Sequence, residues 1–153
     1  MIAVVAVVVA LASYLTWMAG RLDRLAIRVE AAAAALDAQL VRRALIAYEL
    51  SADSGHADLQ AAARLALDER AEGTDRSAVE SDLSRELRAA PEVAVIDEMA
   101  VAAHKVMLAR QFHNDAVRDL LALRQRWVVR VLHLYGRARP PAYVEFDADE
   151  PTG

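Results

Sequence analysis

The chain begins with an apolar run, and no charged side chain occurs before Arg21. As a helix, the stretch IAVVAVVVALASYLTWMA is long enough to cross a hydrocarbon core of about 30 Å. Tyr14 and Trp17, near the end of this stretch, suit the aromatic belt of a membrane interface. The pattern therefore predicts one membrane-spanning helix over residues 2–19.

A cleaved signal peptide is the alternative reading of this run. Ala10-Leu11-Ala12, directly before Ser13, is similar to a small-residue cleavage site. However, no basic segment precedes the apolar run, and the run continues beyond this site. These two features favour an anchor that is retained.

Basic residues follow the span at once, at Arg21, Arg24 and Arg28. By the positive-inside rule, the side of a span that carries such residues lies in the cytoplasm. We therefore expect a single-pass protein of the cell membrane, with its N-terminal end outside and the rest of the chain in the cytoplasm.

Beyond the span, apolar positions recur at steps of three and four, which is the period of one buried helical face. The first such series predicts a helix that leaves the membrane and ends at about Leu50; it comprises Leu22, Leu25, Val29, Ala32, Leu36, Leu40 and Ala44. Turn-forming residues at 51–58 and 71–77, and the Ala90-Pro91 boundary, divide the remainder. The further helices are expected over residues 57–71, 76–89 and 92–135.

Two long helices that flank two short ones predict an all-α fold. We expect the transmembrane helix to continue into an antiparallel four-helix up-down bundle. The corresponding domains are an anchor at 1–20, a cytoplasmic helical bundle at 21–139 and an extended acidic tail at 140–153. The composition agrees, because the chain holds 34 alanines but only 5 glycines and 4 prolines, which are the residues that interrupt helices.

Charge is distributed unevenly, although the formal net charge is only -4. Residues 51–98 hold 12 acidic residues and 5 arginines, whereas residues 104–139 hold 8 basic residues and 2 acidic ones. In an up-down bundle the basic stretch returns to the membrane, where anionic lipid is a simpler partner for it than nucleic acid. Residues 124–135 either touch lipid or continue the bundle core, and their unbroken spacing favours the core. The membrane-proximal basic residues are Arg21, Arg24, Arg28, Arg130, Arg137 and Arg139.

The sequence offers no recognisable catalytic or metal site. The absence of cysteine excludes disulfides, thiolate nucleophiles and Cys-based zinc sites. There is no Gly-x-Ser-x-Gly elbow, no Gly-rich phosphate loop and no His-Glu-x-x-His pair, and the four histidines are scattered. We therefore expect neither an enzyme nor a bound cofactor or metal. The expected partners are the lipid bilayer and another membrane protein, and a homo-oligomer is possible.

The polar block ARQFHNDAVRD, residues 109–119, interrupts the apolar stripe of the last helix. Matching the membrane-proximal ends of the two long helices makes the residue numbers of facing positions add to about 156. This register predicts contacts of Asp37 with Arg118, and of Asp115 with Arg42 or Arg43. Asn114 then occupies an inward position and fixes the register of the two helices. The alternative is that Asp115 and Arg118 form a solvated i,i+3 pair.

Three stretches resemble the LemA family: VEAAAAALDAQLVRR at 29–43, ARQFHNDAVRD at 109–119 and PAYVEF at 141–146. The chain departs from the family at ALIAYELS, residues 44–51, where a segment of the type Asp-Leu-Ile-Pro-Asn-Leu-Val is usual. The resemblance implies a single-pass membrane protein with an extracytoplasmic N-terminus and a helical cytoplasmic domain. The expected function is a scaffold or adaptor at the cytoplasmic membrane face. An accessory subunit of a larger membrane complex is the alternative, and an enzyme with an unrecognised site is a remote one.

Overall fold

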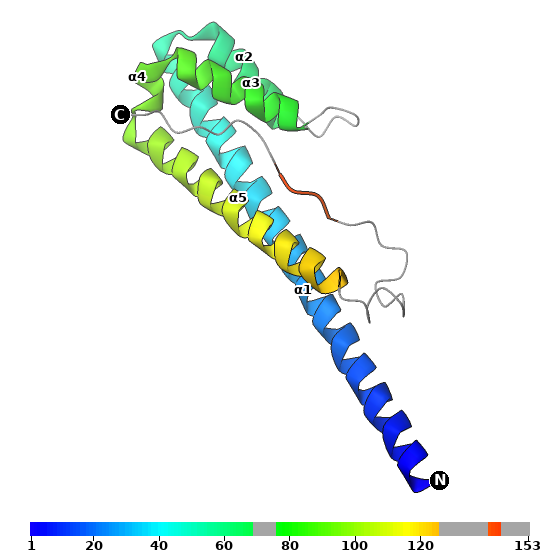
Figure 1. The fold of residues 1–153 in the computed structure, drawn as a ribbon. Helices are drawn as coiled ribbons and strands as arrows, with labels where there is room; N and C mark the ends of the chain where they lie inside the picture. The colour runs from blue at the N-terminus through cyan, green and yellow to red at the C-terminus, as the bar shows by residue number, and fades with distance from the viewer. Residues whose placement is uncertain (69–75, 126–140, 145–153) are drawn as a thin grey trace.

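A computed structural model describes residues 1–68, 76–125 and 141–144 (Figure 1). These residues are almost entirely helical, and no strand occurs among them, which confirms the predicted all-α class. Their helices are α1 (Ile2–Ser54), α2 (Ala57–Asp68), α3 (Arg76–Ala89), α4 (Pro91–Ala94) and α5 (Asp97–Arg124).

Most of the predicted helix boundaries agree with the structure. α2 and α3 begin where the turn residues indicate, and α1 extends four residues beyond the predicted end at Leu50. The short helix α4 was not predicted: Pro91 occupies its first turn, so the long helix α5 begins at Asp97 rather than at residue 92. The predicted continuation of that helix to residue 135 lies outside the described residues.

α1 is a single unbroken helix of 53 residues. It ends at Gly55, whose φ of 78° is left-handed and therefore suits glycine. The backbone N–H groups of Gly55 and His56 both donate to the carbonyl oxygen of Ser51. This cap closes α1 and lets the chain reverse into α2.

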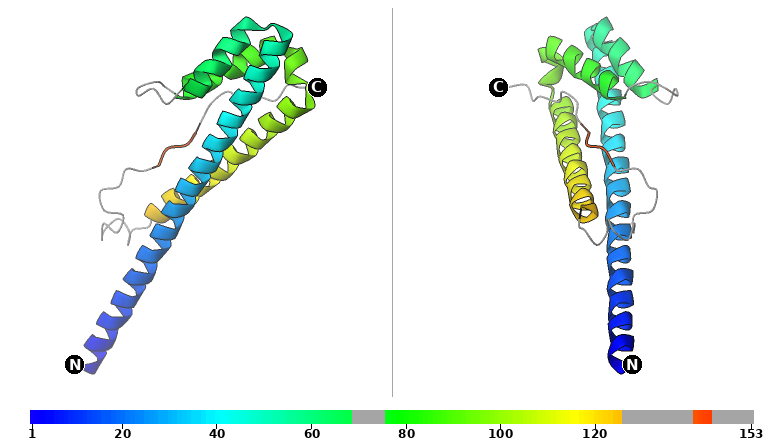
Figure 2. Two further views of the ribbon diagram at one scale, coloured as in Figure 1. Left: turned by 180° about the vertical axis from the view of Figure 1, so that it is seen from behind. Right: turned by 45° about the vertical axis from the view of Figure 1, so that its right-hand side comes forward.

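α5 runs back along the middle of α1, toward the N-terminal end (Figures 1 and 2). Arg28 of α1 and Asp119 of α5 form an ion pair of 3.6 Å, so facing residue numbers add to about 147 instead of the expected 156. The helices are therefore offset from the predicted register by nine residues, or roughly 14 Å at 1.5 Å per residue. Leu36 and Leu40 of α1, which pack against Val106 of α5, agree with the observed register.

α2 and α3 lie together against the end of α1 that is distant from the N-terminus (Figure 2). Small and aliphatic side chains from α1, α2, α3, α4 and α5 form the main core there. Ala44, Ala47 and Ala63 are completely buried in it, and their small side chains let the helix backbones approach closely.

The first part of α1 projects beyond the end of α5, and no other labelled helix lies beside it (Figure 1). Every residue from 2 to 17 except Leu15 is exposed, and the first well-buried side chain is that of Met18. By length and composition, α1 is the one helix among the described residues that can cross a membrane, a criterion that an N-terminal signal sequence also meets.

Candidate functional site

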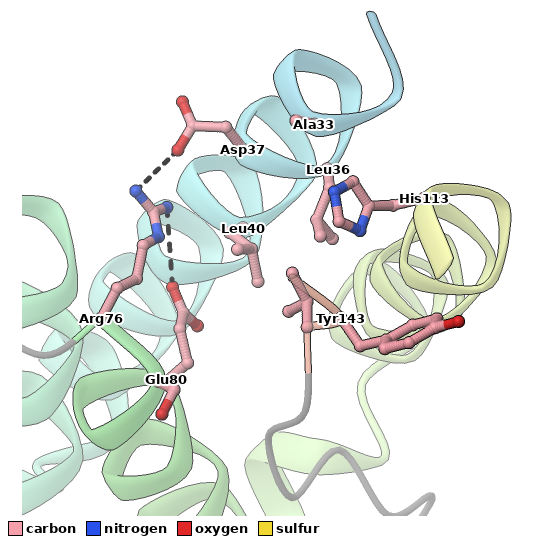
Figure 3. A pocket seen from close by; sticks show the side chains of 10 residues that line it. Ala33, Leu36, Asp37, Leu40, Arg76, Glu80, His113 and Tyr143 are labelled. Carbon is pink, nitrogen blue, oxygen red and sulfur yellow. Dashed lines mark ion pairs between the residues drawn. The ribbon is translucent and has the colours of Figure 1, made fainter. Parts of the chain in front are cut away.

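A cavity of about 390 Å³ lies between α1, α3, α5 and the extended segment 141–144 (Figure 3). One wall is polar, the opposite wall is aliphatic, and His113 and Tyr143 flank the aliphatic side (Figure 3). Its lining residues are Ala33, Leu36, Asp37, Leu40, Arg76, Ser77, Glu80, His113, Tyr143 and Val144.

The polar wall is a chain of charges that links α1 to α3. Nη1 of Arg76 lies 2.6 Å from Oδ1 of Asp37, and Nη2 of Arg76 lies 3.8 Å from Oε1 of Glu80 (Figure 3). Arg76 and Asp37 are partly exposed, with 40% and 58% of their side-chain surfaces accessible, whereas Glu80 is 1% exposed. The wall therefore passes from solvent at Asp37 to the protein interior at Glu80.

Behind this wall, Glu80 forms a second and fully buried ion pair. Nη2 of Arg43 on α1 lies 2.6 Å from Oε2 of Glu80, and the two side chains are 4% and 1% exposed. Nη1 of Arg43 also donates to Oγ of Ser84 at 3.3 Å. Removing one partner from such a pair leaves an uncompensated charge in the interior, which typically costs about 3–5 kcal/mol. This cluster thus fixes α3 against α1.

The aliphatic wall brings together residues from both long helices and from the C-terminal segment. Leu36, Leu40 and Val106 form a small buried cluster, and Val144 packs against it. His113 is 6% exposed, and its Nδ1 lies 3.4 Å from Oδ1 of the neighbouring Asn114. The cavity therefore offers apolar contact on one side and charged groups on the other, an arrangement typical of binding sites.

Asn114 holds the main chain of Val144 through two hydrogen bonds. Its Nδ2 donates to the Val144 carbonyl oxygen at 3.2 Å, and the Val144 N–H donates to its Oδ1 at 3.0 Å. A side-chain amide thus pairs with an extended backbone in the way that a neighbouring strand would. The predicted role of Asn114 in aligning two helices is replaced by this role in holding the segment 141–144.

A second hollow, of about 570 Å³, lies on the other side of Val144 along α5. Besides Val144, it is lined by Met107, Arg110, Gln111, Asn114, Asp115 and Arg118, all on α5. The segment at Val144, held by Asn114, therefore separates the first cavity from this second hollow, which we call the polar groove.

The predicted pairings between the long helices are wrong. Asp37 contacts Arg76 rather than Arg118. Arg118 instead pairs with Asp115 on the same helix at 2.7 Å, with 67% and 44% of the two side chains exposed, which is the solvated i,i+3 alternative. The nine-residue offset explains the error, because Arg118 faces the level of Arg28 and not that of Asp37.

The two arginines expected to meet Asp115 lie apart from it. Arg43 is buried against Glu80, and Arg42 is exposed on α1, where it has no ion pair within the described ranges. Among the six residues of the expected network, Asp37 lies on the polar wall of the first cavity, and Arg43 lies behind that wall. Asn114, Asp115 and Arg118 line the polar groove.

The membrane-proximal arginines that the structure describes follow the exposed apolar part of α1. Arg21 and Arg24 are exposed, and the guanidinium of Arg21 lies 5.7 Å from the centre of the Trp17 ring. Arg28 pairs with Asp119. The remaining expected basic residues, Arg130, Arg137 and Arg139, lie outside the described residues.

Sequence reasoning missed Arg76, Glu80 and Ser84, which supply the polar side of the site. In the sequence, the acidic stretch that contains α3 was interpreted only through its net charge. A signal was nevertheless present, because Glu80 shares the steps of three and four that connect Leu83 and Leu87, both of which are buried. A charged residue within an apolar stripe indicates a buried partner on another element.

Both carboxylates of the polar wall contact a guanidinium, so their charge is balanced within the protein. In the part of the chain that the structure describes, no group of three or more histidine or acidic side chains is placed to hold a metal ion.

Comparison of the chain with protein-family models, with curated proteins and with solved structures gave no match. The resemblance to the LemA family therefore continues to rest on the three sequence stretches. Each of these contributes to the cavity: Asp37 lies in the first, His113 in the second and Tyr143 in the third.

Proposed function

We propose that this protein is a membrane-anchored, LemA-like helical adaptor that holds a partner at the cytoplasmic face of the membrane. The observation that carries the proposal is the continuity of α1, which passes without a break from an exposed apolar segment into the packed part of the fold. The anchor and the scaffold are one rigid helix. The finer architecture that we propose is an antiparallel four-helix up-down bundle.

The exposed apolar segment of α1 supports a bilayer as its environment. Val4, Val7 and Leu11 are 66%, 65% and 55% exposed, which is unfavourable in water. The hydroxyls of Ser13 and Thr16 donate to carbonyl oxygens four residues earlier, so the helix itself satisfies them, as lipid surroundings require.

Residues at the end of the apolar run and just beyond it support retention of the anchor rather than its cleavage. Met18 and Leu22 are 1% and 5% exposed and pack against Leu120 and Leu123 of α5. The apolar run therefore leads directly into side chains that hold the long helices together. A signal peptide has no need of such continuity with the folded part of the chain.

The position of the cavity supports an adaptor in particular. Asp37 is 17 residues beyond Gly20, so a straight helix holds the cavity roughly 26 Å from the membrane surface. The hydrogen bonds of Asn114 to Val144 indicate that this site accepts an extended backbone with an aliphatic side chain. An extended segment of a partner protein has the same chemistry.

Exchange of the span tests the adaptor against the accessory subunit. Residues 2–16 are replaced by an unrelated leucine-rich span of the same length in one variant and deleted in another. Partners are then mapped by crosslinking and mass spectrometry in intact membranes. An adaptor that needs the span only for placement keeps its crosslinked partner with the unrelated span and loses it on deletion.

Loss of the partner with both variants would contradict the adaptor and favour an accessory subunit, because the native span itself would then be a binding surface. Retention of the partner by the deleted form would contradict the need for membrane placement. A chain with Leu11→Ala serves as the control for a small change within the native span.

A further inference from the structure

α1 carries a second apolar face, opposite the one that packs on α5. We call it the α1 seam; its positions are separated by steps of four and three, and all of them are exposed. They are Ile27, Ala31, Ala34, Ala38, Val41 and Leu45. The large members of the seam, Ile27, Val41 and Leu45, are 63%, 41% and 46% exposed. Because opposite faces of a helix cannot contact the same neighbour, α5 cannot cover the seam while it packs against Val29 and Leu36.

Alternating steps of four and three define the heptad pattern of a coiled coil. In that pattern Ile27, Ala34 and Val41 occupy d positions, and Ala31, Ala38 and Leu45 occupy a positions. Alanine at three successive positions allows two helices to approach closely, while the larger residues at both ends supply apolar area. The seam thus has the pattern of a surface that receives another helix.

Charges beside the seam identify the second helix. The g positions Asp23, Glu30 and Asp37 are acidic on one flank, and the other flank carries Arg28 and Arg42 at e positions. In a parallel pair, a g residue faces the e residue five positions later on the partner helix. Asp23 then faces Arg28 of a second copy, and Asp37 faces Arg42. An antiparallel pair instead brings acid against acid and base against base.

Side chains on the flanks are available for these contacts. Asp23, Glu30 and Arg42 are exposed and form no ion pair within the described part of the chain. Arg28 and Asp37 do pair within the chain, but 61% and 58% of their side-chain surfaces stay accessible. A guanidinium or carboxylate with this exposure can accept a further partner.

The same heptad phase continues toward the N-terminal end and places small residues on the corresponding face of the apolar segment. These are Ala3, Ala6, Ala10, Ser13 and Gly20, with Trp17 and Arg24 at the two remaining positions; Arg24 lies outside the apolar segment, between it and the seam. Small side chains at such positions are typical of contacts between membrane helices. Two copies anchored in one membrane are also parallel, in agreement with the charges.

We propose that two copies of this chain form a parallel dimer through the α1 seam. The partner of the seam is a second copy because the acidic flank of one α1 complements the basic flank of another in parallel register. This proposal goes beyond the adaptor function and does not depend on the side of the membrane on which the helices lie.

Single cysteines test the orientation directly, since the chain has none of its own. Ile27→Cys and Leu45→Cys are introduced separately in the full chain, and membranes are treated with an oxidant. In a parallel dimer each variant alone forms a disulfide-linked dimer, because identical positions face each other. Val101→Cys on α5, which replaces a side chain with 52% exposure, serves as the matched control and should stay monomeric.

Three results of this experiment would overturn the proposal. Crosslinking only in a mixture of the two seam variants would show an antiparallel pair. Equal crosslinking at Val101, or none at either seam position, would show random collision or a seam without a second copy.

Opposite charges at Ala35 provide a test that leaves the packed face of α1 unchanged. Ala35 is exposed at an e position, where a parallel partner presents Glu30. Ala35→Arg should therefore strengthen the dimer and Ala35→Glu should weaken it, each by about fivefold in Kd at low salt, because the dimer contains the contact twice. Association of the full chain in detergent is measured as a function of concentration; the reverse order, or no difference, would contradict the parallel pairing.

Discussion

The two halves of α1 differ in what surrounds their apolar side chains. Leu11 is 55% exposed, whereas Leu40, in the same helix, is 4% exposed. Residues 2–14 of α1 are all exposed, whereas the part of α1 from Met18 onward packs against described residues of α2, α3 and α5. Both parts of α1 are helical and rich in apolar side chains, but only one of them is buried against other helices. Apolar composition alone therefore does not reveal whether a stretch of helix packs on protein.

This difference separates two sources of stability. The packed half gains free energy from tertiary burial and from the ion pair of Arg43 with Glu80. Among the described residues, the exposed part of α1 before Met18 gains little burial of that kind, and its apolar surface needs another environment. Our proposal places it in a bilayer, where the same side chains are favourably solvated.

The largest expected effect comes from breaking the buried ion pair in the packed half. Glu80→Ala leaves the 4%-exposed guanidinium of Arg43 without its carboxylate and should lower the free energy of unfolding by about 3–5 kcal/mol. Denaturant unfolding of the full chain in detergent, followed by circular dichroism, measures this loss. The double variant Arg43→Met with Glu80→Leu removes both charges and should recover most of it. A loss below about 1 kcal/mol for Glu80→Ala would show that the pair is not buried.

A matched pair of leucine substitutions compares the halves directly. Leu40→Ala removes a buried side chain and should cost about 2–5 kcal/mol, since it leaves a cavity among Leu36, Val106 and Val144. Leu11→Ala, in the exposed half, should change the unfolding free energy by less than about 0.5 kcal/mol. Equal losses in the same detergent assay would mean that protein also covers the first half.

A smaller effect is expected where the packed half receives the C-terminal segment. Asn114→Ala removes both hydrogen bonds to Val144 and should cost about 1–2 kcal/mol. Asn114→Asp keeps only the oxygen that accepts the Val144 N–H. Its free energy of unfolding should therefore lie between those of Asn114→Ala and the native chain. Limited proteolysis checks the cause, because cleavage near residue 144 should become faster in Asn114→Ala. Unchanged cleavage would contradict the holding role of Asn114.

The smallest effect is expected at the solvated pair on α5. Arg118→Ala removes the ion pair with Asp115, whose side chains are 67% and 44% exposed, and should cost less than about 0.5 kcal/mol. Chemical denaturation at low and high salt measures the difference in unfolding free energy between Arg118→Ala and the native chain. Salt screens the ion pair and should reduce even this small difference. A loss above about 1 kcal/mol would instead support a buried contact of Arg118, as the sequence had suggested with Asp37.

Local features of the sequence predicted the helices, but not their register. The turn at Gly55 and the boundary at Pro91 act on their immediate neighbours, so they indicate where helices end. The register depends on the unforeseen α4 and on where α5 meets α1, and matching the membrane-proximal ends was the wrong assumption. The nine-residue offset then separated Asp37 from Arg118.

The same limit applies to the candidate site. Asp37 and Asn114 stood out as polar residues beside apolar stripes, and both line hollows in the structure. Their partners, Arg76 and the backbone of Val144, come from elements whose placement no local pattern specifies. The pair of Arg43 with Glu80 joins residues 37 positions apart and arises only when α3 packs on α1.

The topology of α1 tests the central claim, that its exposed half is a membrane anchor for a cytoplasmic adaptor. Ile2→Cys and Val101→Cys are expressed separately, and intact cells are treated with a membrane-impermeant thiol reagent. Because the native chain has no cysteine, all labelling reports the introduced residue. The account predicts that Ile2→Cys is labelled in intact cells and that Val101→Cys is labelled only after lysis. Labelling of Val101→Cys in intact cells, with Ile2→Cys protected or removed by cleavage, would contradict it.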